Sequence, residues 1–200
     1  MDVHKRGGRP TSVGRMRGEM LNVEKLTAMA TYFLSRAKDN EIQHIKLMKL
    51  LYISERDNLR ENFSTICSTC FASLEHGPVI SDGLDVMNGK KPERFWDDHI
   101  DYLQLPTRWR LKGDPIDVTD FLSTAEIRTL QKVFVTYGRL SQPEIRELTH
   151  KFPEWDKRAE ENGISYPLEL ETLLLAGLKL EETTAKGVID DLEYYHSLSA

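Results

Sequence analysis

The sequence contains few of the residue patterns on which disulfide-bonded, membrane and secreted proteins depend. It has only two cysteines, Cys67 and Cys70, among 200 residues, so no disulfide framework can be built from it. No apolar run approaches the roughly 20 residues that a membrane-spanning helix needs. The first twenty residues are basic but contain no apolar segment, so they do not resemble a secretory signal. These absences predict a cytoplasmic protein without a membrane span.

Positive charge is also scarce outside the N-terminus. The chain has 27 Lys and Arg against 32 Asp and Glu, a net charge of −5. Residues 1–19 contain five basic and two acidic side chains, so the rest of the chain has a net charge of −8. A protein of this sign lacks the basic surface that binds nucleic acid non-specifically. The charge argues against a nucleic-acid partner and favours a basic protein partner.

Catalytic and metal-binding patterns are missing as well. The chain has no serine or cysteine nucleophile elbow, phosphate-binding glycine loop or HExxH pair. Cys67 and Cys70 form a single CxxC pair, whereas structural zinc needs four ligands at close spacing. Glu75 and His76 are adjacent, and neighbouring side chains of an extended segment point to opposite faces. We expect no catalytic residues, no cofactor and no metal, and we expect His76 to hydrogen-bond the backbone at a turn. A hydrolase or metal protein using Cys67, Cys70 and His76 is retained as one alternative.

Helical periodicity dominates what is present. Apolar residues recur at helical spacing from Val23 to Ala37, after Asn22, a suitable N-cap. Residues 42–60 are apolar around most of the helix circumference, which is typical of a helix in the middle of a fold, so Leu50 should be buried. We expect a mainly α (α+β) fold: a single compact helical domain (20–200) around this central buried helix, with a small antiparallel sheet. A disordered basic tail (1–19) should precede it.

The segment between Phe63 and Gly89 should change from strand to helix. β-Branched and aromatic residues predict a short strand over 63–74, which Gly77 and Pro78 then end. Because proline suits the first position of a helix, a short helix is expected from Pro78 to Asn88. The remaining expected elements are two extended segments (100–105 and 109–113) and two C-terminal helices (167–175 and 181–198).

Two capping boxes indicate a pair of consecutive helices between residues 123 and 150. Each box places a serine three residues before a glutamate, at Ser123 and at Ser141, and each is preceded by a leucine. The short turn between the two helices is typical of a helix-turn-helix. However, the second helix begins with Gln142, Glu144, Arg146 and Glu147, which is a poor surface for reading DNA. A DNA-binding transcriptional regulator that uses helices 123–150 and the basic tail is therefore the alternative function.

Three stretches resemble, in their order and spacing, the Panacea domain of SocA-type antitoxins. They are IKLMKLLYISERDNL, FASLEHGPVISDGLDVMNG and LSTAEIRTLQKVFVTYGRLSQPEIRELTHKFPEW, and the resemblance spans about residues 23–192. It implies a compact, non-enzymatic domain that neutralises a cognate toxin by binding it and that, in some members, delivers the toxin to a protease. The motif residues that carry the resemblance are Leu50, Gly77, Pro78, Val79, Thr149 and His150.

Two features depart from the family pattern. The family usually has adjacent proline and tryptophan after the histidine, whereas Glu154 separates Pro153 from Trp155 here. The central helix usually continues with small and aromatic residues, whereas here it becomes charged from Glu55 to Asp57. These departures bear on the partner surface rather than on the fold.

The candidate partner-binding residues are three tryptophans and one histidine. Aromatic and arginine anchors dominate the binding energy of most protein interfaces. Trp96, Trp109 and Trp155 are expected in or beside loops, where binding side chains are common, and His76 at the rim of its turn. The alternative role for each tryptophan is packing at the edge of the core.

Overall fold

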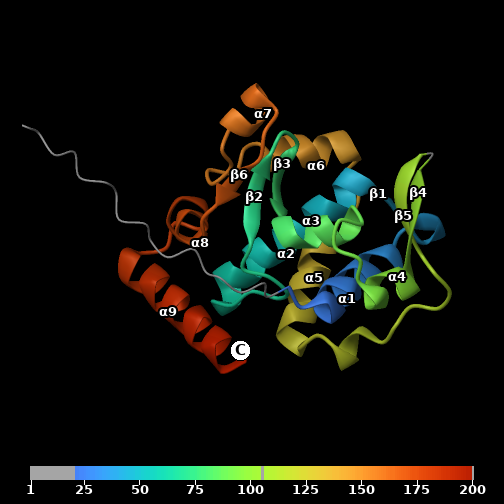
Figure 1. Ribbon diagram of the computed structural model, residues 1–200, viewed down its shortest axis with the longest axis horizontal. Helices are drawn as coiled ribbons and strands as arrows, with labels where there is room; N and C mark the ends of the chain where they lie inside the picture. Colours follow the sequence, from blue (N-terminus) through green and yellow to red (C-terminus); the bar gives the residue numbers. More distant parts are fainter. Residues whose placement is uncertain (1–20, 105, 200) are drawn as a thin grey trace, which may run out of the picture.

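Helix α2 (His44–Asn62) lies at the centre of the computed structural model, which describes residues 21–104 and 106–199 (Figure 1). Twelve of its residues are buried, including Leu50, which has no exposed surface. The central helix and the mainly helical fold are therefore confirmed. The helix begins two residues later than expected, because Ile42 belongs to a strand.

The other helices surround α2 or extend the fold beyond it. Helices α1, α5 and α6 all pack against α2. The remaining helices are shorter, apart from the C-terminal one. The helical bounds are α1 (Val23–Leu34), α3 (Ser81–Met87), α4 (Arg94–His99), α5 (Thr124–Tyr137), α6 (Gln142–Thr149), α7 (Arg158–Asn162), α8 (Leu170–Thr172) and α9 (Glu182–Ser199).

Two small antiparallel sheets accompany the helices, where one sheet was expected. The first has the strand order β1-β5-β4 and the second β3-β2-β6. The two extended segments predicted from the sequence are β4 and β5. Of the strand predicted over 63–74, only the last four residues form a strand, β2. The strand bounds are β1 (Glu41–Gln43), β2 (Phe71–Leu74), β3 (Gly77–Ile80), β4 (Ile100–Gln104), β5 (Thr107–Leu111) and β6 (Tyr166–Leu168).

The short helix expected from Pro78 to Asn88 is present as α3, but it begins only at Ser81, because Gly77 and Pro78 belong to a strand. Both residues lie in β3, which forms a hairpin with β2 through a turn of two residues, Glu75 and His76. Gly77 is not extended but has a φ of +97°. Pro78 pairs with Ser73, next to the pair that flanks the turn. In an antiparallel ladder this second pair exchanges no backbone hydrogen bonds, so the missing N–H of proline is not needed there.

The capping signals are confirmed. The hydroxyls of Ser123 and Ser141 accept from the backbone N–H of the glutamates three residues later, and both reciprocal hydrogen bonds are present. The side chain of Asn22 caps α1 by accepting from Lys25 N. Gly138 follows α5, where a Cβ would lie only 2.5 Å from the carbonyl oxygen of Phe134.

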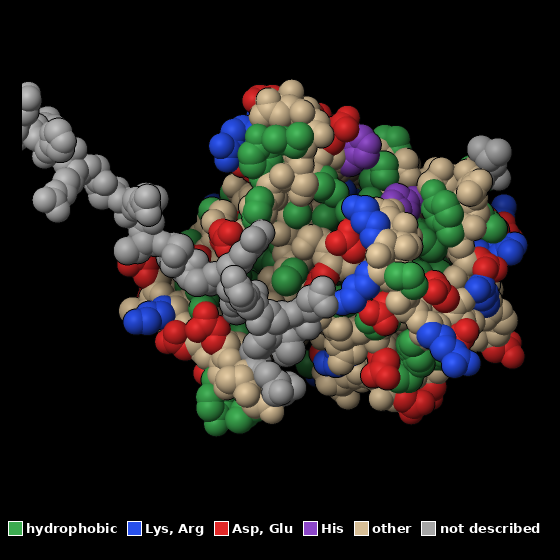
Figure 2. Space-filling model, in the orientation of Figure 1, with side chains coloured by type: hydrophobic (Ala, Val, Ile, Leu, Met, Phe, Trp, Pro, Cys, Tyr) green, Lys and Arg blue, Asp and Glu red, His purple; other side chains and the backbone are tan. Residues whose placement is uncertain are grey.

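Both helices expected in the C-terminal region are present, but the first is shifted toward the C-terminus and covers residues 170–177. The first residues of the range 167–175, where a helix was expected, belong to strand β6. Helical turns start at Leu170. Helix α9 has an exposed apolar end, at the lower left of Figure 2. Its side chains Tyr194, Tyr195 and Leu198 are 60–65% exposed. The expected tail, residues 1–19, lies outside the described residues. None of the described helices has the length and apolar character required to span a bilayer.

Candidate functional site

Two sequence motifs that are about 70 residues apart meet at the turn of the β2–β3 hairpin. The first is the stretch from His76 to Val79, and the second is the end of α6 with the segment that follows it (Figure 1). A Cβ placed on Gly77 would lie 2.6 Å from Thr149 Oγ1 and 3.2 Å from His150 Cδ2. The hairpin backbone therefore approaches α6 so closely that only glycine fits. We define the hairpin site as Lys49, His76, Gly77, Thr149, His150 and Trp155.

Lys49 connects the hairpin to the central helix. Its side chain has no exposed surface, and Nζ donates a hydrogen bond of 2.9 Å to the carbonyl oxygen of Pro78. Burial lowers the pKa of Lys49 well below its usual range, and the positive charge of Arg146 lowers it further. Burial disfavours the charged form of an amine, and the carbonyl oxygen of Pro78 accepts from Nζ in place of water. Lys49 thus acts as a hydrogen-bond donor that fixes the hairpin against α2.

Trp155 holds the hairpin from the other side. Its ring stacks on His150, with 4.0 Å between centroids and 18° between planes. Trp155 Nε1 donates to the carbonyl oxygen of Leu74, at 3.0 Å, and the N–H of Asp156 donates to Ser73 Oγ, also at 3.0 Å. The segment after α6 is therefore bonded to β2 through both a side chain and the backbone.

Among the described residues, two imidazole nitrogens of the hairpin site have no hydrogen-bond partner. Nδ1 of His76 and Nε2 of His150 are both buried, and neither is paired within the described residues. The hydrogen bond expected to fix the turn through His76 is therefore not made by Nδ1. Burial lowers the pKa of His150, as does the charge of Arg146, and these outweigh the opposite effects of Glu160 and Glu147. Buried polar atoms without partners are uncommon, so these two nitrogens are an unusual feature of the hairpin site.

Trp96 and Trp109 occupy positions different from those expected. They lie in α4 and β5 rather than in loops, and they are 1% and 3% exposed. Their rings meet edge to face, 5.4 Å apart, and Trp109 Nε1 donates to His44 Nδ1 at 2.9 Å. Both side chains pack in the core, which was the alternative role considered for them, and neither adjoins the hairpin site.

A buried ion pair, which sequence reasoning missed, lies beside this site. Arg56 Nε is 2.7 Å from Glu154 Oε1, and the hydroxyl of Tyr52 donates to the same oxygen at 3.0 Å. A second guanidinium nitrogen of Arg56 donates to the carbonyl oxygen of Gly177 at 2.7 Å. The signal was present in the sequence, since Glu154 and the charged turn of the central helix are its two departures from the family pattern.

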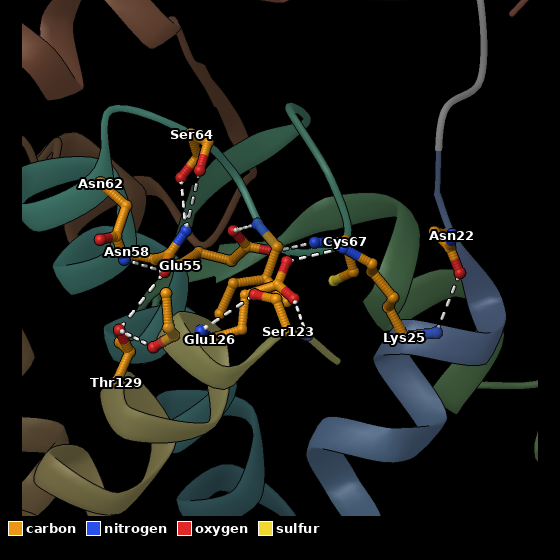
Figure 3. Close-up of polar contacts among 12 residues, drawn as sticks. Asn22, Lys25, Glu55, Asn58, Asn62, Ser64, Cys67, Ser123, Glu126 and Thr129 are labelled. Atoms are coloured by element: carbon orange, nitrogen blue, oxygen red, sulfur yellow. Dashed lines mark hydrogen bonds and ion pairs between the residues drawn. The ribbon is translucent and has the colours of Figure 1, made fainter. Parts of the chain in front are cut away.

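Glu55 explains why the CxxC segment is structural (Figure 3). Its carboxylate is fully buried and accepts hydrogen bonds from the backbone N–H groups of Ile66, Cys67 and Ser68, at 2.6, 2.6 and 3.2 Å. Burial raises the pKa of Glu55 to about 7, although these hydrogen bonds oppose the shift. Burial and the neighbouring Glu55 also raise the pKa of the Cys67 thiol well above its usual value, which disfavours the reactive thiolate. In the part of the chain that the structure describes, no three His, Cys, Asp or Glu residues are grouped to hold a metal.

The fold and site thus define a mainly helical α+β domain in which a glycine-dependent hairpin is clamped between a buried lysine and a histidine–tryptophan stack. The family model of the antitoxin SocA-like Panacea domain matches residues 47–156. The match covers more than half of the chain and includes the whole hairpin site, so the protein belongs to the SocA-like Panacea antitoxin family. Neither curated proteins nor solved structures provided a match.

Proposed function

We propose that this protein is a cytoplasmic antitoxin that neutralises its cognate toxin by stoichiometric binding. The observation that carries the proposal is the family match over residues 47–156. The roles of individual side chains agree with it. The buried side chains of Lys49 and Glu55 hold the hairpin and the CxxC loop in place, which is a structural role.

We propose that the toxin-binding surface of this protein includes the turn of the β2–β3 hairpin and Trp155. Glu75 is exposed, whereas His76 and Trp155 are half-buried. The turn is rigidly supported by Lys49 from within and by the His150–Trp155 stack from the side, so little conformational entropy is lost when it binds. The unpaired Nδ1 of His76 offers a polar contact that a partner can satisfy. Supported aromatic and polar groups of this kind are typical of interface hot spots.

The DNA-binding alternative gains no support from α6. Arg146, the one arginine of that helix, is 2.7 Å from Glu147 and 3.0 Å from Glu160, so its charge is already neutralised. On the face shown in Figure 2, acidic and basic side chains are interspersed. A DNA-reading helix instead presents cations to phosphates. Delivery of a bound toxin to a protease would require the same binding step and would appear as loss of toxin protein.

The proposal is tested by co-expression with the toxin encoded by the adjacent reading frame. We expect growth rescue at about one antitoxin per toxin and co-elution of the two proteins in gel filtration, with toxin levels unchanged. Glu75→Arg should weaken rescue, whereas Glu171→Arg, which places the same change at an exposed position on α8, should not. Rescue far below equimolar antitoxin without a complex would mean that neutralisation is catalytic or degradative.

A further inference from the structure

A basic groove lies apart from the hairpin site and shares no residue with it. It has a volume of about 830 Å³ and lies between the end of α1, strand β1 and the C-terminal end of α5. Its floor includes Ile42, which is 4% exposed, and its wall includes Val135, which is 74% exposed. We define the basic groove by its cations, Arg36, Lys38, Lys46, Arg108 and Arg139, together with the apolar Ile42, Phe134 and Val135.

The charge of the groove is opposite to that of the chain. Of the residues that the structure describes, five cations and one carboxylate, Glu41, line it, whereas the whole sequence has a net charge of −5. Glu41 is 3.6 Å from Arg108. Within the described residues, Arg36, Lys38 and Arg139 form no ion pair. Like charges held together without counter-charges repel one another, so this arrangement favours an anionic occupant.

Two cations of the groove are held in place by neighbouring groups. The guanidinium of Arg36 lies 3.6 Å above the ring of Tyr32 and donates to the carbonyl oxygen of Tyr32. Lys46 Nζ donates to the carbonyl oxygen of Gly138 at 2.7 Å. Burial lowers the pKa of Lys46, and the nearby carboxylate of Glu144 partly offsets this effect. The groove therefore presents positioned charges, which lose less entropy on binding than free side chains do.

The groove runs along the free edge of a sheet. Strand β1 is the edge strand of the β1-β5-β4 sheet, and all three of its residues line the groove. Because successive side chains of a strand point to opposite faces, a groove that all three contact follows the edge of the strand rather than one face. An edge strand presents backbone donors and acceptors that can pair with an added strand. The N–H of Glu41 already donates to the carbonyl oxygen of Lys38, so an added strand would pair with the other backbone groups of this edge.

We propose that the basic groove binds an acidic, extended segment of a protein partner, which adds a strand to the free edge of β1. Carboxylates of this segment meet Arg36, Lys38 and Arg139, and its apolar side chains pack against Ile42 and Val135. Nε of Arg108, which is buried and unpaired in the described part of the chain, supplies a further donor. A phosphate ligand would use the cations but neither the strand edge nor the apolar wall, so the combination favours a polypeptide. The inference holds whether or not the partner is a toxin.

The test uses a short, end-blocked peptide of alternating valine and glutamate, titrated into the isotope-labelled full chain and followed by nuclear magnetic resonance. We expect shifts confined to β1, the end of α1 and the end of α5. The charge-reversed double variant Lys38→Glu/Arg139→Glu should bind at least about tenfold more weakly. The matched variant Lys179→Glu/Lys186→Glu, which makes the same change in net charge at exposed sites outside the groove, should bind like the parent.

Three further probes separate strand addition from simple charge attraction. A peptide with N-methylated valines cannot pair with β1 through those amides and should lose binding. A valine–lysine peptide should not bind, and a single-stranded oligonucleotide or adenosine triphosphate should bind more weakly than the acidic peptide. Tighter binding of either phosphate ligand, full binding of the N-methylated peptide, an equal loss in both double variants, or no shifts with the acidic peptide would overturn the proposal.

Discussion

Arg56 and Glu154 form an ion pair across 98 positions of sequence, with 2.7 Å between Arg56 Nε and Glu154 Oε1. Both side chains are nearly excluded from solvent, at 10% and 0% exposure. The pair joins the central helix to the segment that contains Trp155. Two departures from the family pattern, the charged helix turn and the glutamate between Pro153 and Trp155, are therefore the two halves of one structural feature.

Removal of one member of this pair should destabilise the protein strongly. Arg56→Met leaves the Glu154 carboxylate buried without its cation, which costs about 3–5 kcal/mol in comparable pairs. Arg56→Met/Glu154→Leu removes both charges, so the loss in the double variant should be smaller than the sum of the two single losses. Urea unfolding of the parent, the two single variants and the double variant measures this coupling. Additive losses would show that the two charges do not interact.

Replacement of Gly77 by alanine should destabilise the protein more than the same replacement at Gly89, another glycine of positive φ. Gly77→Ala adds a backbone penalty of about 1–2 kcal/mol for a left-handed residue and a contact of 2.6 Å between Cβ and Thr149 Oγ1. Gly89 has a φ of +68°, and a Cβ added there would meet no atom within 4 Å, so Gly89→Ala carries the backbone penalty alone. Thermal unfolding should therefore show a larger loss for Gly77→Ala. Equal losses would mean that α6 moves away without cost.

Leu50 tests the position of the central helix. Its side chain has no exposed surface, and Leu50→Ala should lower the free energy of unfolding by about 2–5 kcal/mol, as for other buried leucines. Val135→Ala, at a position that is 74% exposed, should change it by less than about 0.5 kcal/mol. A small effect of Leu50→Ala in denaturant titrations would contradict the burial of α2.

Glu55 should make stability depend on pH between about 4.5 and 7. Its pKa rises from 4.5 to about 7 in the folded protein, so the folded state binds more protons than the unfolded state in this window. Its contribution is therefore fully present below pH 4.5 and is lost as the pH rises through 7, by an amount on the order of 3 kcal/mol. Glu55→Gln cannot titrate, so the difference in unfolding free energy between parent and variant should change across this window. Parallel pH profiles of the two proteins would disprove the shift.

The features that could be predicted from the sequence are those encoded by local spacing. The apolar circumference of α2 and the serine–glutamate boxes at Ser123 and Ser141 depend on residues within one or two turns of each other. Strands β4 and β5 also correspond to the two extended segments that the sequence predicts over 100–105 and 109–113. In these segments, local preference and tertiary structure agree.

The hairpin and the buried polar groups depend on long-range contacts and could not be predicted in the same way. Pro78 is compatible with both a helix start and an edge strand, and Ser73, its pairing partner, decides between them. The local spacing around Lys49 does not predict its hydrogen bond, because the acceptor, the carbonyl oxygen of Pro78, is distant in the sequence. The burial of Trp96 and Trp109 could not be predicted for the same reason, because turn signals nearby in the sequence do not indicate whether a side chain is buried.

The stoichiometry of binding tests the central claim most directly. Isothermal titration calorimetry of the purified adjacent toxin into this protein should give about one toxin per antitoxin. His76→Ala and Glu75→Arg should each weaken the interaction by at least about tenfold, while Glu171→Arg should bind like the parent. Neutralisation of the toxin by protein that forms no complex with it, in calorimetry or in gel filtration, would contradict the account.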